Sequence, residues 1–151
     1  MIEKLKSLFG KEAPQVDRSP EKLHLAAAVL MVEAAFMDGE FTEEERSTID
    51  TLLKQHFGLS DADTTELIAL AEEEHEVAGH LFRYTKAIKD ALDEQERLEI
   101  IELLWQVVYA DGESHAYEAN LLRRIAGLIY VSDRDRGDAR KRVLARMGVN
   151  E

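Results

Sequence analysis

The stretch AAFMDGEFTEEE at residues 34–45 returns as VVYADGESHAYE at residues 107–118. At an offset of 73 residues, the two stretches share an Asp-Gly-Glu triplet and a glutamate five residues after the triplet. The aligned pairs are Phe36 with Tyr109, Asp38 with Asp111, Gly39 with Gly112, Glu40 with Glu113, and Glu45 with Glu118. At an offset of 72, Ser60, Asp61 and Asp63 align with Ser132, Asp133 and Asp135. The chain is therefore predicted to contain an internal repeat.

Around the repeat, apolar residues recur at helical spacing, and no segment shows the sustained alternation of a β-strand. One face of the first helix, for example, is predicted to carry Leu23, Ala27, Leu30, Ala34 and Met37. The pattern predicts helices over residues 20–37, 43–57, 61–74, 80–92, 94–109, 116–129 and 133–147. We expect an all-α fold, a helical bundle of about seven helices built from two pseudo-symmetric helical-hairpin repeats.

The repeat also predicts the domain organisation. Its halves cover about residues 21–75 and 94–147, and the helix over 80–92 joins them. Both prolines, Pro14 and Pro20, lie in the polar stretch 10–20, which is typical of a linker. We expect residues 1–20 to form a short leader helix and linker, and residues 21–151 to form one all-helical domain.

Local signals mark several helix ends. Thr42 and Glu45 fit a capping box, and Ser60, Asp93 and the Ser19-Pro20 pair are N-terminal signals. Gly58 is expected to end the second helix, whose inner side is predicted to carry Ile49, Leu52, Leu53 and His56. Trp105 and the aromatic residues near it are predicted to be core.

Composition excludes several classes of protein. The 151 residues carry a formal net charge of −12, which disfavours nucleic acid as a partner. No cysteine is present, so thiolate metal centres, disulfides and thiol nucleophiles are absent. No apolar run is long enough for a transmembrane helix, and no secretory signal is visible. We expect a cytoplasmic protein.

Each repeated loop offers carboxylates at its first, third and eighth positions. The candidate metal ligands are Asp38, Glu40, Glu45, Asp111, Glu113 and Glu118. Oxygen ligands suit hard divalent cations such as Ca²⁺, Mg²⁺ or Mn²⁺, although each loop is shorter than that of an EF-hand. The alternative is purely structural, because helix capping uses the same residue types. Recurrence of the same spacing in both halves favours a bound cation or a partner protein.

On these motifs, FMDGEFTEEE at 36–45 and YADGESHAYE at 109–118, the chain resembles the tellurite-resistance TerB family, which includes the TerB-like domain of membrane-anchored DnaJ-type co-chaperones. The resemblance covers about residues 23–147. It implies a seven-helix bundle of paired hairpins whose acidic loops are a divalent-metal or partner site in stress-response complexes. Asp38, Glu45, Asp111, Glu118 and both glycines match the family's pattern, whereas His115 stands where the first copy has Thr42.

These features indicate two functions. The first is a non-enzymatic TerB-like module whose paired loops bind a divalent cation or a partner protein. The second is a structural adaptor of the co-chaperone type whose loops only cap helices. An enzyme is disfavoured, because no convergent acid, base and nucleophile are visible in the sequence.

Three further features have mainly structural interpretations. The run EEEHE at 72–76 is predicted to be a solvated helix end, although His75 and its neighbours could hold a cation. The basic residues from Arg123 onward are expected to pair with the acidic body of the domain. The leader over residues 1–9 could contact a membrane at most peripherally, and packing onto the domain or disorder is favoured.

Overall fold

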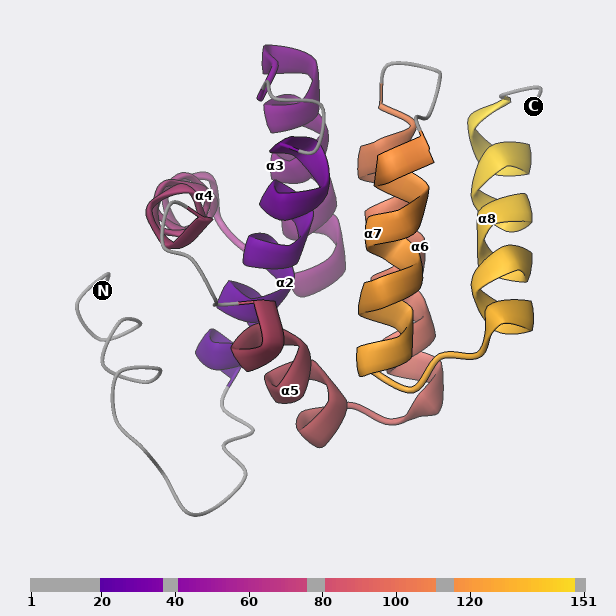
Figure 1. Cartoon of the computed structure of the whole chain (residues 1–151). Coiled ribbons are helices and arrows are strands. Elements are labelled where there is room, and N and C mark those ends of the chain that lie inside the picture. Colours follow the sequence, from indigo (N-terminus) through magenta and orange to yellow (C-terminus); the bar gives the residue numbers. More distant parts are fainter. Residues whose placement is uncertain (1–19, 37–40, 76–80, 111–115, 149–151) are drawn as a thin grey trace.

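A computed structural model of the protein describes residues 20–36, 41–75, 81–110 and 116–148. These ranges contain helices and turns and no strand, so the predicted all-α class is confirmed. The helices are α2 (Pro20–Ala35), α3 (Glu43–Phe57), α4 (Asp61–His75), α5 (Leu81–Ala91), α6 (Glu94–Val108), α7 (Ala116–Leu128) and α8 (Asp133–Met147) (Figure 1). The leader and linker predicted over residues 1–20 lie outside the described residues, except for Pro20.

The predicted helix ends are close to the observed ones because the capping signals are local. Thr42 and Asp93 each form a complete capping box with the glutamate three residues later. The hydroxyls of Ser60 and Ser132 each accept a hydrogen bond from the amide three residues on, at 3.1 Å. Gly58 ends α3 with a φ of +67°, a conformation that glycine adopts without strain.

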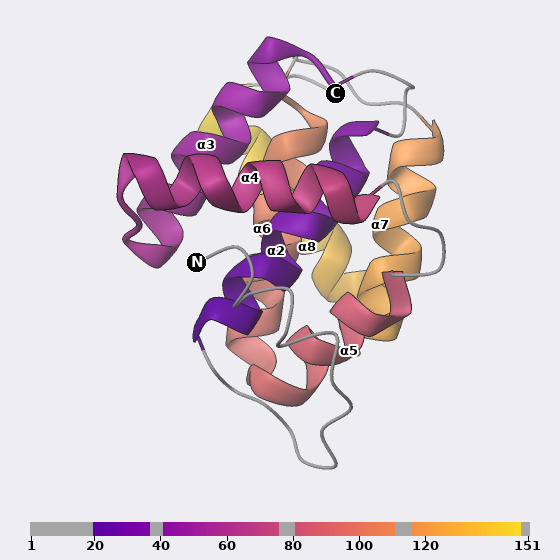
Figure 2. The same ribbon diagram turned by 90° about the vertical axis from the view of Figure 1, so that its left-hand side faces the viewer.

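Helix α2 lies at the centre of the bundle and contacts α3, α4, α5, α6 and α7 (Figure 2). Every residue from 25 to 32 is buried, so the predicted one-sided stripe on this helix was incomplete. The reason is composition: LAAAVLMV is apolar around the whole helix, and the small alanines let neighbours approach from several sides. Of the predicted stripe, Met37 lies outside the described residues.

The two halves contain their helices in the same order, but the third helix is placed differently in each half. In each half the first helix makes its most extensive contact with the third, α2 with α4 and α6 with α8. Helix α4 appears nearly end-on in Figure 1 and crosses the other helices in Figure 2, whereas α8 runs beside α6 and α7. The repeat therefore describes the helix-loop-helix units better than it describes the third helices.

Helix α8 is held to α6 by aromatic and charged side chains. Trp105, 3% exposed, donates from Nε1 to the carbonyl oxygen of Arg136 at 3.2 Å. Arg142 and Arg146 both bind the carboxylate of Glu102, at 3.1 and 2.9 Å. Arg140 donates to the hydroxyl of Tyr109 at 2.8 Å. The core role of Trp105 is thus confirmed. The predicted pairing with the acidic body is confirmed for Arg142 and Arg146, whereas Arg136 pairs with Asp133 of its own helix.

Within the described ranges, no helix is both long enough and apolar enough to span a membrane.

Candidate functional site

Two buried glutamates lie at equivalent positions of the two repeats. Glu45 is 6% exposed and Glu118 is 3% exposed, and no other Asp or Glu in the part of the chain that the structure describes is buried. Each is the third residue of its helix, α3 or α7. A buried carboxylate loses its hydration, which hydrogen bonds or an opposite charge must offset. Among the described residues, this pair is the strongest candidate for a functional role.

The carboxylate of Glu45 is held at the start of α3. Its Oε1 accepts from the Thr42 amide at 2.9 Å and from the Thr42 hydroxyl at 3.0 Å. In return, the Glu45 amide donates to the Thr42 hydroxyl oxygen at 3.1 Å. These bonds satisfy amides that a helix start leaves without partners. They also fix the carboxylate beside the chain segment that precedes the helix.

The other predicted ligands lie outside the described residues, namely Asp38, Glu40, Asp111 and Glu113. The end of α2, the start of α3, the end of α6 and the start of α7 all lie at the upper end of the bundle in Figures 1 and 2. Glu45 and Glu118 are therefore in helices that start at the same end. No group of three or more metal-binding side chains occurs within the ranges that the structure describes. Assembly of all six carboxylates into one surface stays a prediction.

An aromatic and charged cluster lies next to the first acidic loop. The rings of Phe36 and Phe41, which flank the loop, have centroids 5.1 Å apart. His75 stacks on Phe36 at 4.3 Å, and its Nδ1 lies 2.7 Å from Oε1 of Glu33. The predicted solvated helix end was therefore wrong for His75, which links α4 to α2. Nothing near His75 in the sequence indicates this contact, because Glu33 is 42 residues away.

The neighbours of His75 also have partners on other helices. Glu72 forms an ion pair with Arg46 of α3 at 2.7 Å, and Arg46 lies 4.7 Å from the centre of the Phe41 ring. Glu74 accepts from the hydroxyl of Tyr84 of α5 at 2.7 Å. Burial, together with Glu74, raises the pKa of Tyr84 above its ordinary value. Glu72, Glu74 and His75 at the end of α4 thus contact three different helices, as expected when neighbouring side chains on a helix point in different directions.

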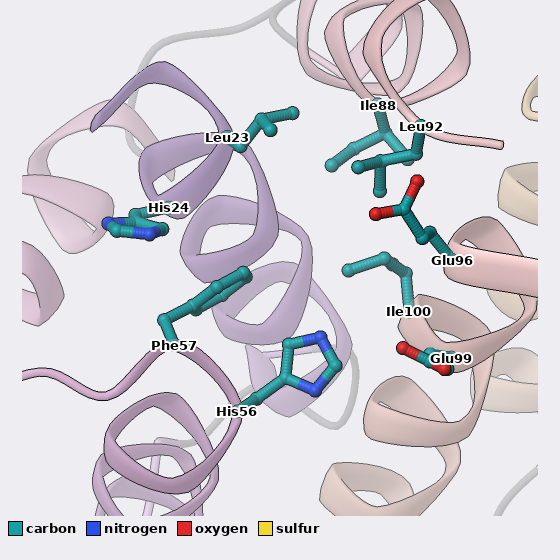
Figure 3. Close-up of a pocket in the computed structure, with 9 residues that line it drawn as sticks. All are labelled: Leu23, His24, His56, Phe57, Ile88, Leu92, Glu96, Glu99 and Ile100. Carbon is teal, nitrogen blue, oxygen red and sulfur yellow. The ribbon is translucent and has the colours of Figure 1, made fainter. Parts of the chain in front are cut away.

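A pocket of about 350 Å³ opens between α2, the end of α3, the end of α5 and the start of α6 (Figure 3). It is lined by Leu23, His24, His56, Phe57, Ile88, Leu92, Glu96, Glu99 and Ile100. His56 is exposed, which corrects the prediction that it lies on or near the inner side of α3. His56 comes after Leu52 and Leu53, the last buried residues of α3, and its side chain lines the pocket instead. The sequence contains no motif that predicts this pocket, because its lining comes from four separate helices.

The two histidines of the pocket lie on either side of Phe57. The Phe57 ring is 4.4 Å from the His24 ring and 4.8 Å from the His56 ring. Burial lowers the pKa of His24 below its ordinary 6.5, an effect that nearby Glu21 opposes and that His56 reinforces. His24 is therefore favoured in its neutral form in the folded protein.

This shift predicts a loss of stability in acid. In the unfolded chain His24 binds a proton near pH 6.5, whereas the folded chain binds it only at lower pH, so stability falls as the pH decreases through this range. We expect the free energy of unfolding to fall less between about pH 7.5 and pH 5.5 in His24→Gln than in the parent protein. Urea unfolding at each pH measures the difference. His56→Gln is the control and should keep most of the pH dependence; equal losses in His24→Gln and the parent would contradict the prediction.

The comparisons with known proteins agree with the helical architecture. A family model described as Tellurite resistance protein TerB matches residues 24–141. The matched region runs from the first turns of α2 into α8 and includes both acidic loops. Neither the search of curated proteins nor the search of solved structures gave a significant match.

Proposed function

Since the chain belongs to the TerB family, we propose that it is a non-enzymatic module of the cytoplasmic stress response, of the tellurite-resistance type, whose paired acidic loops bind a divalent cation. The observation that carries this proposal is the burial of Glu45 and Glu118 at equivalent positions of the two repeats. Capping alone explains an acid in the first turn of a helix, since exposed acids such as Glu43 and Glu44 are found there too. Capping does not require that the equivalent glutamate be buried in both repeats.

The donor set fits a hard cation. The residues that would hold it are Asp38, Glu40 and Glu45 in the first loop, and Asp111, Glu113 and Glu118 in the second. All are carboxylates, which Ca²⁺, Mg²⁺ and Mn²⁺ prefer over the nitrogen and sulfur ligands that softer ions select. A carboxylate has several lone pairs, so Glu45 can keep its bonds to Thr42 and still bind a cation. A bound cation would neutralise charge that the two loops otherwise concentrate.

The proposal predicts a response of both loop glycines to metal. In a ¹⁵N-labelled sample, titration with Ca²⁺, Mn²⁺ or Mg²⁺ should shift or broaden the amide signals of Gly39 and Gly112, because both glycines lie between the proposed ligands. Signals from α8, such as that of Val143, serve as the internal reference. Unchanged glycine signals at about 1 mM cation, the weak end of protein Ca²⁺ sites, would eliminate the metal function.

Matched variants distinguish the loss of a cation ligand from the loss of a negative charge alone. Glu45→Gln removes a charged ligand, so it should raise the cation's dissociation constant, measured from the Gly39 signal, by roughly tenfold or more. A tenfold change corresponds to about 1.4 kcal/mol of binding free energy. Glu44→Gln removes the same charge from the neighbouring, exposed position and should leave the response intact. Glu118→Gln should act in the same way on Gly112. Equal effects of the Glu44 and Glu45 variants would show that only the general charge matters.

A second candidate function is a protein-interaction adaptor whose loops only cap helices. The capping box of Thr42 and Glu45 favours it, since both Thr42 donors are satisfied without a cation. On this proposal, Asp38→Ala combined with Asp111→Ala lowers stability equally with and without Ca²⁺, and the partner protein is still retained in a pull-down. Native mass spectrometry of protein purified without chelator distinguishes the two candidates, because it detects bound metal and bound protein together.

A further inference from the structure

The pocket between α2, α3, α5 and α6 combines an apolar base with an acidic side. The apolar surface that an occupant can contact comes from Leu23, Phe57 and Leu92, which are partly buried, whereas Ile88 and Ile100 in the lining are almost completely inaccessible. Its volume of about 350 Å³ is at the small end of ligand pockets. A space of this size suits one or two apolar side chains better than a large cofactor.

The acidic side comes from one turn of α6. Figure 3 shows Glu96 and Glu99 on the side of the pocket opposite His56 and Phe57. Oε1 of Glu96 accepts from the amide of Asp93 at 3.0 Å, which fixes this carboxylate at the start of α6. Two acids beside an apolar base favour an occupant with apolar side chains and positive charges close together.

The first nine residues of the chain have this chemistry. They read MIEKLKSLF, with apolar side chains at Ile2, Leu5, Leu8 and Phe9 and ammonium groups at Lys4 and Lys6. If these residues form a helix, Ile2, Leu5 and Phe9 recur at helical spacing and share one face. Nine residues are too few to form a stable helix alone, so an apolar surface is needed to stabilise one.

The connection between this segment and the pocket is short. Pro20 begins α2, and Leu23, only three residues later, already lines the pocket. Residues 10–19 make up the connection, and ten residues span at most about 36 Å when fully extended. The segment is therefore tethered next to the opening, which gives it a high effective concentration there.

We propose that residues 2–9 bind in this pocket of their own chain, with Leu5 among the apolar side chains of the base and Lys4 and Lys6 beside Glu96 and Glu99. The proposal is independent of the cation proposed at the acidic loops: the pocket is lined by residues from the first turns of α2 and α6, whereas the acidic loops follow the last residues of these helices in the sequence.

A spin label on the 151-residue chain tests the proposal. The protein has no cysteine, so Ser7→Cys gives a single attachment site for a nitroxide. We expect the methyl signals of Ile88 and Ile100 to lose most of their intensity, while that of Val143 on α8, which does not line the pocket, is retained. Reduction of the nitroxide should restore the lost signals. Equal intensities at the three sites, or losses confined to another surface, would overturn the proposal.

Variants and mixing complete the test. Leu5→Asp should remove the selective loss, and Glu99→Lys should weaken it, with recovery when Lys4→Glu and Lys6→Glu are added. Glu94→Lys, on the same helix but outside the pocket lining, is the matched control and should have no effect. In a mixture of spin-labelled protein with isotopically labelled parent protein, the parent signals should stay intact. Their selective loss would assign the segment to a second copy of the chain and refute binding within one molecule.

Discussion

Replacement of Trp105 by alanine is expected to lower the free energy of unfolding by about 3–5 kcal/mol. The indole is 3% exposed and lies between α6 and α8, where its Nε1 donates to the carbonyl oxygen of Arg136. It also lies close to the Tyr109 ring and the Arg140 guanidinium, with centroid distances of 5.9 Å in both cases. The alanine variant loses this apolar contact, the hydrogen bond and the cation–π contact together.

The effect is measured by urea unfolding with far-UV circular dichroism, because the variant lacks the protein's single tryptophan. Trp105→Phe keeps a buried aromatic ring but not the hydrogen bond, so its free energy of unfolding should fall clearly less than that of Trp105→Ala. Phe82→Ala truncates an aromatic side chain that is 63% exposed, and it should change stability by no more than about 0.5 kcal/mol. A Trp105→Ala loss no larger than the Phe82→Ala loss would argue against the observed packing of α8.

Replacement of Leu30 by alanine is expected to lower the free energy of unfolding by about 2–5 kcal/mol. Leu30 is completely buried in α2, the helix that contacts both halves of the repeat. Its truncation leaves a space that closely packed neighbours fill only in part. Because Trp105 belongs to the second half, its fluorescence reports whether a change in the first half is transmitted to the second.

If residues 21–151 form one domain, as the repeat predicts, the Trp105 fluorescence transition shifts to lower urea together with the circular dichroism transition. Met147→Ala is the control, since Met147 is an apolar residue that is 39% exposed. Two separated transitions in Leu30→Ala would instead show that the halves unfold independently.

The sequence predicted most helix boundaries because each is encoded within a few residues. The capping boxes of Thr42 with Glu45 and Asp93 with Glu96, and the left-handed Gly58, need no distant partner. Burial of every residue from 25 to 32 in α2 was missed because a one-face pattern cannot reveal neighbours on every side. The contact between His75 and Glu33 was missed for a related reason: it depends on how α4 crosses α2.

The candidate site was also predicted in part. The repeat identified Glu45 and Glu118 as equivalent, and the structure adds that both are buried. Burial could not be predicted, because a capping box specifies only hydrogen bonds at the helix start: Glu96 completes the capping box of α6 in the same way and is exposed. The pocket near His56 had no local signal at all, since its lining is assembled from side chains far apart in the chain.

The burial of α2 has a consequence for hydrogen exchange. Amides in a central helix with no exposed face exchange with solvent mainly when the whole protein opens, so they report global stability. A ligand that binds only the folded state raises that stability by about 2.7 kcal/mol at 100 times its dissociation constant. A cation held at the acidic loops would therefore slow deuterium uptake at Val29 and Leu30, in the middle of α2, without contacting either residue.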